Sequence, residues 1–290
     1  MTGNVLHSRG VALALGGGLC LSSAGILLRY IESADGWQIL FYRSLTFFIT
    51  MALVVAWRYR SGTLRAFVAL GLRGWLAGLV LGLGSITYIY AILLTSVANA
   101  VFIIGSAPLL TALLAWLVLS ERLGLPAIFS MVLAFLGIGL MFADGIESGG
   151  MAGNICALAV ALSYAIYLLL VRNAGNVDML PAISVAGLFT AGIAWFMTDS
   201  IQISNHDLVI TVLLGTVQFS AGFMLLTLAA RYIAAAEVAL FSLSEAILAP
   251  LWVWLLISET PSLFTISGAS IVLVAVVGYI LHGIKVNRTV

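Results

Sequence analysis

Charged residues are scarce in this sequence. Asp, Glu, Lys and Arg together make up 8% of the 290 residues, whereas about a quarter of a typical soluble domain is charged. Hydrophobic residues make up 63%. A water-soluble chain of this length could not cover its core with so few charges, so we expect an integral membrane protein. The net charge of +1 is also too small to indicate a nucleic-acid partner.

Cysteine and histidine are scarce too. Cys20 and Cys156 both lie inside apolar runs, which favours packing roles over a disulfide. The three histidines, His7, His206 and His282, are too scattered to form a metal-ligand set or a nucleophile–histidine–acid group. The sequence therefore predicts a protein that is not an enzyme and that needs no metal or other cofactor. No cleavage site follows the first apolar run, so we expect no secretory signal peptide.

Long apolar runs make up most of the sequence. A helix needs about 20 apolar residues to cross a bilayer, and ten runs reach or approach that length. They lie near residues 10–30, 36–57, 74–94, 97–119, 125–143, 151–171, 180–198, 208–230, 233–257 and 263–283. Most connections are short, which predicts antiparallel neighbours. The longest connection is 58–73.

The second half of the chain repeats a pattern of the first. Residues 96–121 match residues 234–259 with a shift of 138. In this register Ser106 corresponds to Ser244, and Glu121 corresponds to Glu259. The sequence therefore predicts a tandem duplication, with five-helix repeats at 1–145 and 146–290 that form one transport domain.

The basic residues predict the orientation of these repeats. With a cytoplasmic N-terminus, the cytoplasmic segments hold ten of the 12 basic residues, as the positive-inside rule requires. These are Arg9, Arg58, Arg60, Arg65, Arg73, Arg122, Arg172, Arg231, Lys285 and Arg288. Both termini are then cytoplasmic. Because five spans is an odd number, the two repeats enter the membrane in opposite senses, as in secondary transporters with a midplane substrate site. We therefore expect two inverted five-helix repeats around a central cavity.

Two charged residues lie well inside expected spans. An unpaired carboxylate near the middle of a span costs about 2.5–3.5 kcal/mol on insertion scales. Glu245 must therefore face a cavity, contact a partner or carry a proton. It suits proton coupling or recognition of a substrate ammonium group, and a bond to a neighbouring helix is the structural alternative. Arg43 suits an ion pair with Glu245 or Glu32, or a clamp on a substrate carboxylate. Snorkelling to the interface is its structural alternative.

Further polar residues are candidates for the wall of the cavity, and helix–helix hydrogen bonding is an alternative role for each of them. They are Ser22, Ser23, Tyr88, Tyr90, Asn99, Tyr164, Tyr167, Gln218 and Ser244.

Helix breaks and gating contacts have their own candidates. Pro108 and Pro250 interrupt expected spans four and nine. Glu237, at the cytoplasmic start of span nine, is a candidate gate contact, with stabilisation of a helix N-terminus as the alternative. The triple glycine 16–18 lacks the Lys-Ser/Thr of a phosphate loop, which leaves tight packing or a flexible point.

The motifs of the two halves show a family resemblance. The first half carries Arg43, Gly82, Tyr88, Ala91, Ala98, Pro108 and Glu121. The second keeps Pro250 and Glu259 but lacks the arginine, and its proline is displaced relative to Pro108. This pattern resembles the drug/metabolite transporter superfamily, specifically its ten-helix EamA-type exporters, over nearly the whole chain.

Within that superfamily the chain is similar to bacterial amino acid exporters of the YddG kind. This resemblance implies export of amino acids, aromatic ones included, across a bacterial inner membrane. It also implies a cavity walled by spans one to four and six to nine, with spans five and ten outside. We expect alternating access with a small-molecule substrate, membrane lipid as the other partner, and no bound nucleic acid.

Other functions of the same fold stay open. A nucleotide-sugar or sugar-phosphate carrier would need several cations to match phosphate, and Arg43 is the one basic residue well inside a span. A drug-type carrier and a flippase of lipid-linked substrates are further alternatives. A channel would need a repeated filter motif, and none is visible. The sequence leaves the oligomeric state open.

Overall fold

The protein is helical throughout the part of the chain that the structure describes. The computed structural model describes residues 2–119, 124–148, 150–172, 177–233, 238, 241 and 243–288. Within these residues there is no strand, so the expected all-α class is confirmed. The elements are α1 (Thr2–Arg29), α2 (Gly36–Tyr59), the 3-10 turn η1 (Arg60–Gly62), α3 (Thr63–Ala69), α4 (Gly71–Leu94), α5 (Val97–Ile104), α6 (Ala107–Leu119), α7 (Leu125–Ser148), α8 (Met151–Arg172), α9 (Leu180–Met197), α10 (Asn205–Leu213), the π-helical η2 (Leu214–Ala221), α11 (Gly222–Ala229), α13 (Ser244–Ile257) and α14 (Leu263–Arg288).

The described helices account for all ten expected spans, in order. Eight helical segments are long and apolar enough to cross a membrane, by length and composition. Two shorter apolar helices, Ile128–Ala143 within α7 and Ser244–Ile257, stand where spans five and nine are expected. A helical segment leaves few unpaired backbone groups in lipid, which is why long apolar runs in this chain become helices.

Two expected spans are broken rather than continuous. Span four consists of α5 and α6, which are separated by a turn at 105–106. In span nine, α13 begins at Ser244, directly after a turn at Leu243. With the shift of 138 seen in the sequence, these two breaks fall at the same position of the repeat. The longest connection is also more ordered than its length suggests, because it contains η1 and α3.

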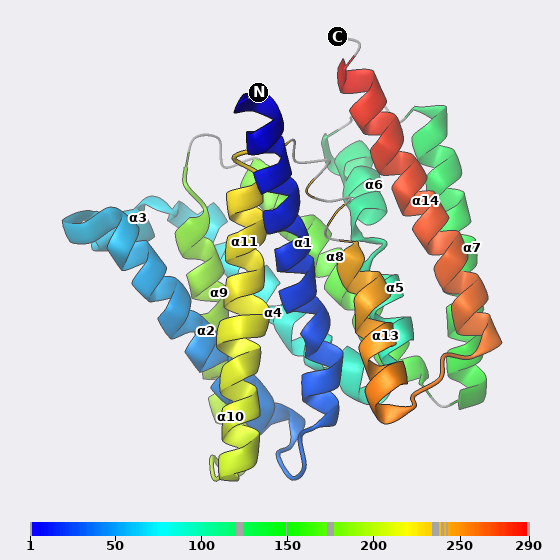
Figure 1. Cartoon of the computed structure of the whole chain (residues 1–290). Coiled ribbons are helices and arrows are strands. Elements are labelled where there is room, and N and C mark those ends of the chain that lie inside the picture. Colours follow the sequence, from blue (N-terminus) through cyan, green and yellow to red (C-terminus); the bar gives the residue numbers. More distant parts are fainter. Residues whose placement is uncertain are drawn as a thin grey trace.

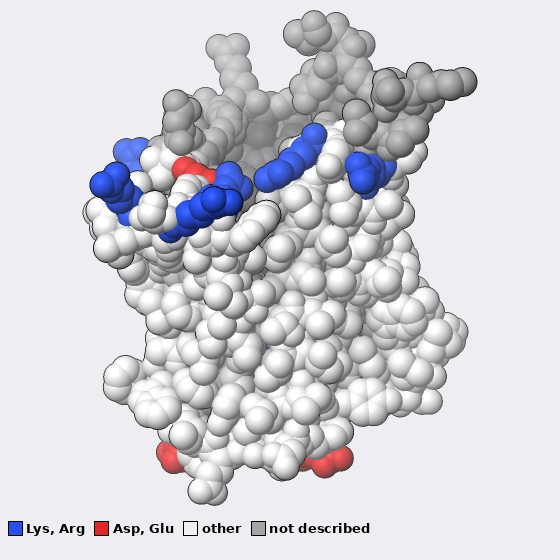
Figure 2. Space-filling model, turned by 60° about the vertical axis from the view of Figure 1, so that its left-hand side comes forward, with Lys and Arg blue, Asp and Glu red and all other residues white. Residues whose placement is uncertain are grey.

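Charge divides the molecule into two ends. The start of α1 and the end of α14 lie at the same end of the bundle (Figure 1). Figure 2 shows Lys and Arg side chains gathered at that end, which we name the termini end, with an acidic side chain among them, while the opposite, acidic end carries Asp and Glu side chains.

The helices pack in two groups. In the larger one, α4 lies against α8 and α9, α2 lies against α9, and α1 lies against α11 and α13. The second group is the pair α7 and α14, which lies to one side of the bundle (Figure 1). Gly137 and Gly268 let this pair approach closely, because a Cβ at Gly137 would lie 2.7 Å from the Gly268 carbonyl oxygen.

Candidate functional site

Arg43 lies at the centre of the larger group and is 1% exposed. Its Nη1 donates a hydrogen bond to Ser85 Oγ of α4 at 2.7 Å. Its guanidinium lies 4.3 Å from the ring centroid of Phe219 in η2 and 5.6 Å from that of Tyr88 in α4. Aromatic faces attract cations most strongly where water is excluded. Three helical elements therefore hold one buried cation in place.

The same guanidinium retains unused hydrogen-bond donors. Nε and Nη2 of Arg43 have no partner among the described residues, and neither does the nearby buried hydroxyl of Tyr88. Arg43 forms no ion pair with Glu245 or Glu32 in this part of the chain, so two of the partners considered for it are not in place. A buried charged donor without a partner is costly. Arg43 is therefore equipped to bind an acceptor that the protein itself does not supply.

Glu245 lies in the first turn of α13, immediately after the break in span nine. Its side chain is partly exposed. The tyrosines Tyr88 and, in α8, Tyr164 lie near it. The break therefore places this carboxyl at the N-terminal end of a helix.

Tyr88 lies near both charged residues, with the Arg43 guanidinium 5.6 Å from its ring centroid. We name Arg43, Ser85, Tyr88, Tyr164, Phe219 and Glu245 the central cluster. Its members come from α2, α4, α8, η2 and α13, so both halves of the chain contribute. The cluster holds one cation, one acid and several rings.

Glycines allow the surrounding helices to come close enough to form this cluster. A Cβ at Gly18 of α1 would collide with Ser244 Oγ, and one at Gly17 would lie 2.8 Å from Leu226. Gly215 of η2 meets Thr46 of α2 in the same way, one turn from Arg43. The triple glycine therefore serves tight packing, which was one of the two roles expected for it. The Ser244 hydroxyl is buried without a partner among the described residues.

Three other expected cavity residues make helix–helix or local bonds instead. Ser22 Oγ accepts a hydrogen bond from Trp252 Nε1 at 3.0 Å and donates one to the Leu19 carbonyl. Ser23 donates to the carbonyl of Cys20. Gln218 donates to the Leu21 carbonyl at 3.3 Å, while its Oε1 has no partner in the described part. Gln218 thus keeps one free acceptor.

Three further candidates lie outside the central cluster. Tyr90 packs edge-on against Trp37, with ring centroids 5.4 Å apart, near the start of α2 at the acidic end. Tyr167 stacks on Tyr164 but belongs to an apolar wall between α4, α8 and α9. Asn99 Oδ1 accepts a hydrogen bond from Thr265 Oγ1 of α14 at 2.7 Å.

The expected helix-breaking residues have different surroundings. Pro108 is the second residue of α6, where proline costs little because the first amides of a helix lack partners. Pro250 lies inside α13 and lines a hollow of about 170 Å³ between α5, α13 and α14. Glu121 and Glu237 lie outside the described residues. Pro108 therefore follows the break at 105–106 closely, whereas Pro250 lies inside α13, after the turn at 243.

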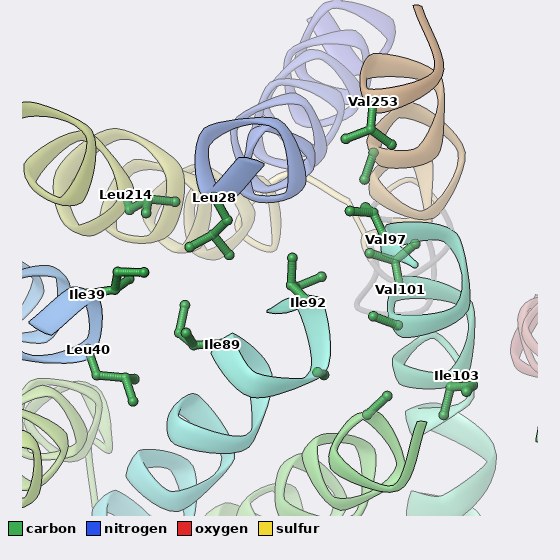
Figure 3. Close-up of a cluster of buried hydrophobic side chains, with 14 of the residues drawn as sticks. Leu28, Ile39, Leu40, Ile89, Ile92, Val97, Val101, Ile103, Leu214 and Val253 are labelled. Carbon is green, nitrogen blue, oxygen red and sulfur yellow. The ribbon is translucent and has the colours of Figure 1, made fainter. Parts of the chain in front are cut away.

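An apolar cluster, which we name the seal, fills the bundle toward the acidic end. Buried side chains from the last turn of α1, the start of α2, the end of α4, the start of α5, η2 and α13 meet there (Figure 3). They include Leu28, Ile39, Leu40, Ile89, Ile92, Val97, Leu214 and Val253. This cluster separates the central cluster from the acidic surface.

Polar contacts hold this seal from outside. Arg29 Nε donates to Glu259 Oε2 at 2.9 Å, and Glu259 Oε1 accepts from the Val97 amide at 2.9 Å. The buried carboxylate of Asp207 accepts the backbone amides of residues 32–34 and the Ser33 hydroxyl. Both groups join the first half of the chain to the second.

Several of these residues were not identified from the sequence. Ser85, Trp252 and Arg29 carry no motif, and their partners are distant in the chain. Glu259 was identified from the sequence as the repeat of Glu121, but its partner Arg29 was not.

These features define an all-helical integral membrane protein whose two halves meet at a buried polar cluster. The sequence profile of the EamA-like transporter family matches residues 8–143 and again residues 151–281. The chain therefore belongs to this family of the drug/metabolite transporter superfamily, and it is a membrane transporter of small molecules.

Other comparisons bear on the fold. No curated protein matches the sequence. A solved structure described as "Crystal structure of protein" has 17% sequence identity and a TM-score of 0.63, and the match covers 96% of this chain and 99% of that chain. At this identity the likeness supports the fold alone.

Proposed function

We propose that this transporter exports amino acids, aromatic ones included, by alternating access across a bacterial inner membrane. The observation that carries the proposal is Arg43, a buried cation with two unused donors beside the unpartnered Tyr88 hydroxyl. A carboxylate is the ligand that a guanidinium binds best, through two parallel hydrogen bonds.

The remainder of the cluster suits the other groups of an amino acid. Glu245 provides a negative charge for the ammonium group, and Tyr88 lies near both charged residues. Phe219, Tyr88 and Tyr164 supply rings, which favour apolar and aromatic side chains through burial and ring–ring contacts. A zwitterion with an apolar side chain therefore satisfies the cation, the acid and the rings together.

The direction of access follows from the seal. With the acidic end closed by the apolar cluster and the Arg29–Glu259 pair, substrate reaches the central cluster from the termini end. We assign the termini end to the cytoplasm by the positive-inside rule. The break at 243 puts the start of α13, with Glu245, in the central cluster, and interrupted helices at the substrate site are a feature of other inverted-repeat transporters. The division into repeats at 1–145 and 146–290 belongs to the same proposal.

Competition in reconstituted vesicles tests the substrate. Proteoliposomes loaded with one unlabelled aromatic amino acid should accumulate its labelled form, and other amino acids should compete. The decarboxylated amine and the deaminated acid should each compete at least tenfold more weakly, because each leaves one charged side chain of the site without a partner. Competition only by sugar phosphates or organic cations would replace the amino acid with one of the alternative substrates.

A further inference from the structure

The connection between α2 and α4 forms an ordered projection at the termini end. We name residues 57–75 the elbow. It comprises the last turn of α2, η1, α3 and the first turn of α4, and α3 extends outward from the bundle at this end (Figure 1). Because α2 and α4 are both membrane-spanning, the elbow lies where the chain leaves one span and enters the next, at the boundary of the bilayer.

The elbow has a defined conformation. Arg60 has φ +48° and ends α2, with its amide donating to the Ala56 carbonyl. The Thr63 hydroxyl donates to the Arg60 carbonyl at 2.7 Å, and Gly71 makes the turn into α4 with φ +56°. Leu70 is buried against Met179 and its neighbours. One side of the elbow is therefore anchored, and the other keeps a fixed orientation.

The outer side of the elbow is apolar. Leu64 is 77% exposed, Val68 72% and Leu72 76%, and these residues recur at intervals of four. Trp57, at the end of α2, is 83% exposed. Exposed apolar side chains at the boundary of the bilayer can enter the lipid, and Trp and Leu at this depth are typical of the membrane interface.

Cations accompany these apolar side chains. Arg60 and Arg65 are exposed, and neither has an acidic partner among the described residues. Arg58, by contrast, is paired with Asp178 at 2.8 Å. The elbow sequence contains no Asp or Glu, and Figure 2 shows Lys and Arg side chains along this end of the molecule.

We propose that the elbow is a binding surface for anionic phospholipids of the leaflet at the termini end. Arg60 and Arg65 contact the phosphate and the charged headgroup, while Leu64, Val68 and Leu72 enter the acyl region. Charge complementarity selects anionic over zwitterionic lipid, because basic residues beside a membrane gain free energy only from net negative headgroups. The proposal stands on residues remote from the central cluster, so it does not depend on the identity of the transported substrate.

Native mass spectrometry of the whole purified protein, titrated with phosphatidylglycerol or phosphatidylcholine, tests this surface. The wild type should bind the first phosphatidylglycerol more tightly than phosphatidylcholine. The Arg60→Gln/Arg65→Gln variant should bind phosphatidylglycerol roughly tenfold more weakly, with affinity for phosphatidylcholine unchanged. Arg60→Lys/Arg65→Lys should retain the preference for phosphatidylglycerol. The single variant Arg65→Gln keeps Arg60 and its turn, and it should lose part of the affinity for phosphatidylglycerol.

The matched control is Arg9→Gln/Arg231→Gln. It removes the same charge from exposed positions at the same end but leaves the elbow untouched. It should bind phosphatidylglycerol as the wild type does. Equal loss in the control and in the elbow variant would overturn the proposal, because the lipid would then respond to total charge. A wild type without preference for phosphatidylglycerol would overturn it as well.

Discussion

Arg29 and Glu259 form an ion pair of 2.9 Å that joins the end of α1 to the loop after α13. The pair connects the first half of the chain to the second on the outside of the apolar seal. Arg29 also donates to the Thr95 carbonyl, and Glu259 also accepts the Val97 amide. Opening the central cluster toward the acidic end must therefore break several polar contacts at once.

Weakening this pair should favour opening at the acidic end. Both side chains are about a quarter exposed. We therefore expect Glu259→Gln to change the free-energy difference between the forms closed and open at the acidic end by about 1 kcal/mol, which is roughly fivefold in the population of the open form. The measurement is the labelling rate of Ile92→Cys, a buried seal position, by an impermeant maleimide in a Cys20→Ser/Cys156→Ala background. Labelling should rise with Glu259→Gln and stay constant with the control Glu32→Gln, an exposed acid at the same end. No rise would show that the pair does not hold the seal.

Arg43→Ala should impair carboxylate-bearing substrates selectively. The variant removes the donors Nε and Nη2, whereas an amine lacking the carboxylate never used them. We expect amino acid uptake in counterflow to fall by at least tenfold, with a smaller effect on the corresponding amine. Ser85→Ala, which removes only the hydroxyl that accepts from Nη1, is the milder control. Equal losses for amino acid and amine would indicate that Arg43 is structural.

Glu245→Gln should impair transport or alter its pH dependence without lowering expression. The substitution keeps the size of the side chain but removes the charge at the start of α13. The measurement is the counterflow rate of the variant and the wild type between pH 5.5 and 8.5. Identical rates across that range would exclude a role of the carboxyl in coupling or in binding the ammonium group.

Gly18→Ala should destabilise the protein, because the added Cβ collides with Ser244 Oγ. Overpacking of this kind costs about 1–3 kcal/mol. Gly139→Ala is the matched control, since a Cβ there meets nothing within 4 Å. The double variant Gly18→Ala/Ser244→Ala should recover part of the thermal stability, because the next nearest atoms, Glu245 N and Ser244 Cβ, lie 3.5 Å away. A double variant no more stable than Gly18→Ala would contradict this packing.

Asp178 should give a small stabilisation that disappears in acid. Partial burial raises its pKa, but hydrogen bonds from Tyr59 and the Leu180 amide, together with Arg58, outweigh burial, so the pKa lies below its usual value. The stabilisation is therefore present above the unfolded pKa of about 3.9 and is lost as the pH falls through the lower folded pKa. We expect Asp178→Asn to lower stability by about 0.5 kcal/mol at pH 7, since the pair is exposed. Melting curves at pH 7 and pH 3 would contradict this if the deficit of Asp178→Asn were not smaller at pH 3.

The spans could be predicted from the sequence because length and apolar content alone determine them. Arg43 and Glu245 were identifiable for the same reason, since a charge within an apolar run is conspicuous. The contacts of Arg43 were not, because Ser85 and Phe219 reach it only through the rotation and tilt of other helices. The pair Tyr88 and Tyr90 shows the limit. Residues two positions apart lie about 200° apart around a helix, so polarity suggested both while geometry places only Tyr88 beside Arg43.

Counterflow in wild-type proteoliposomes tests the central claim most directly. Labelled aromatic amino acid is the probe, and the competitors are the same amino acid, its decarboxylated amine, its deaminated acid and a sugar phosphate. We expect strong competition by the intact amino acid and at least tenfold weaker competition by both truncated forms. Equal competition by the amine, or competition by the sugar phosphate alone, would contradict recognition of a zwitterion by Arg43 and Glu245.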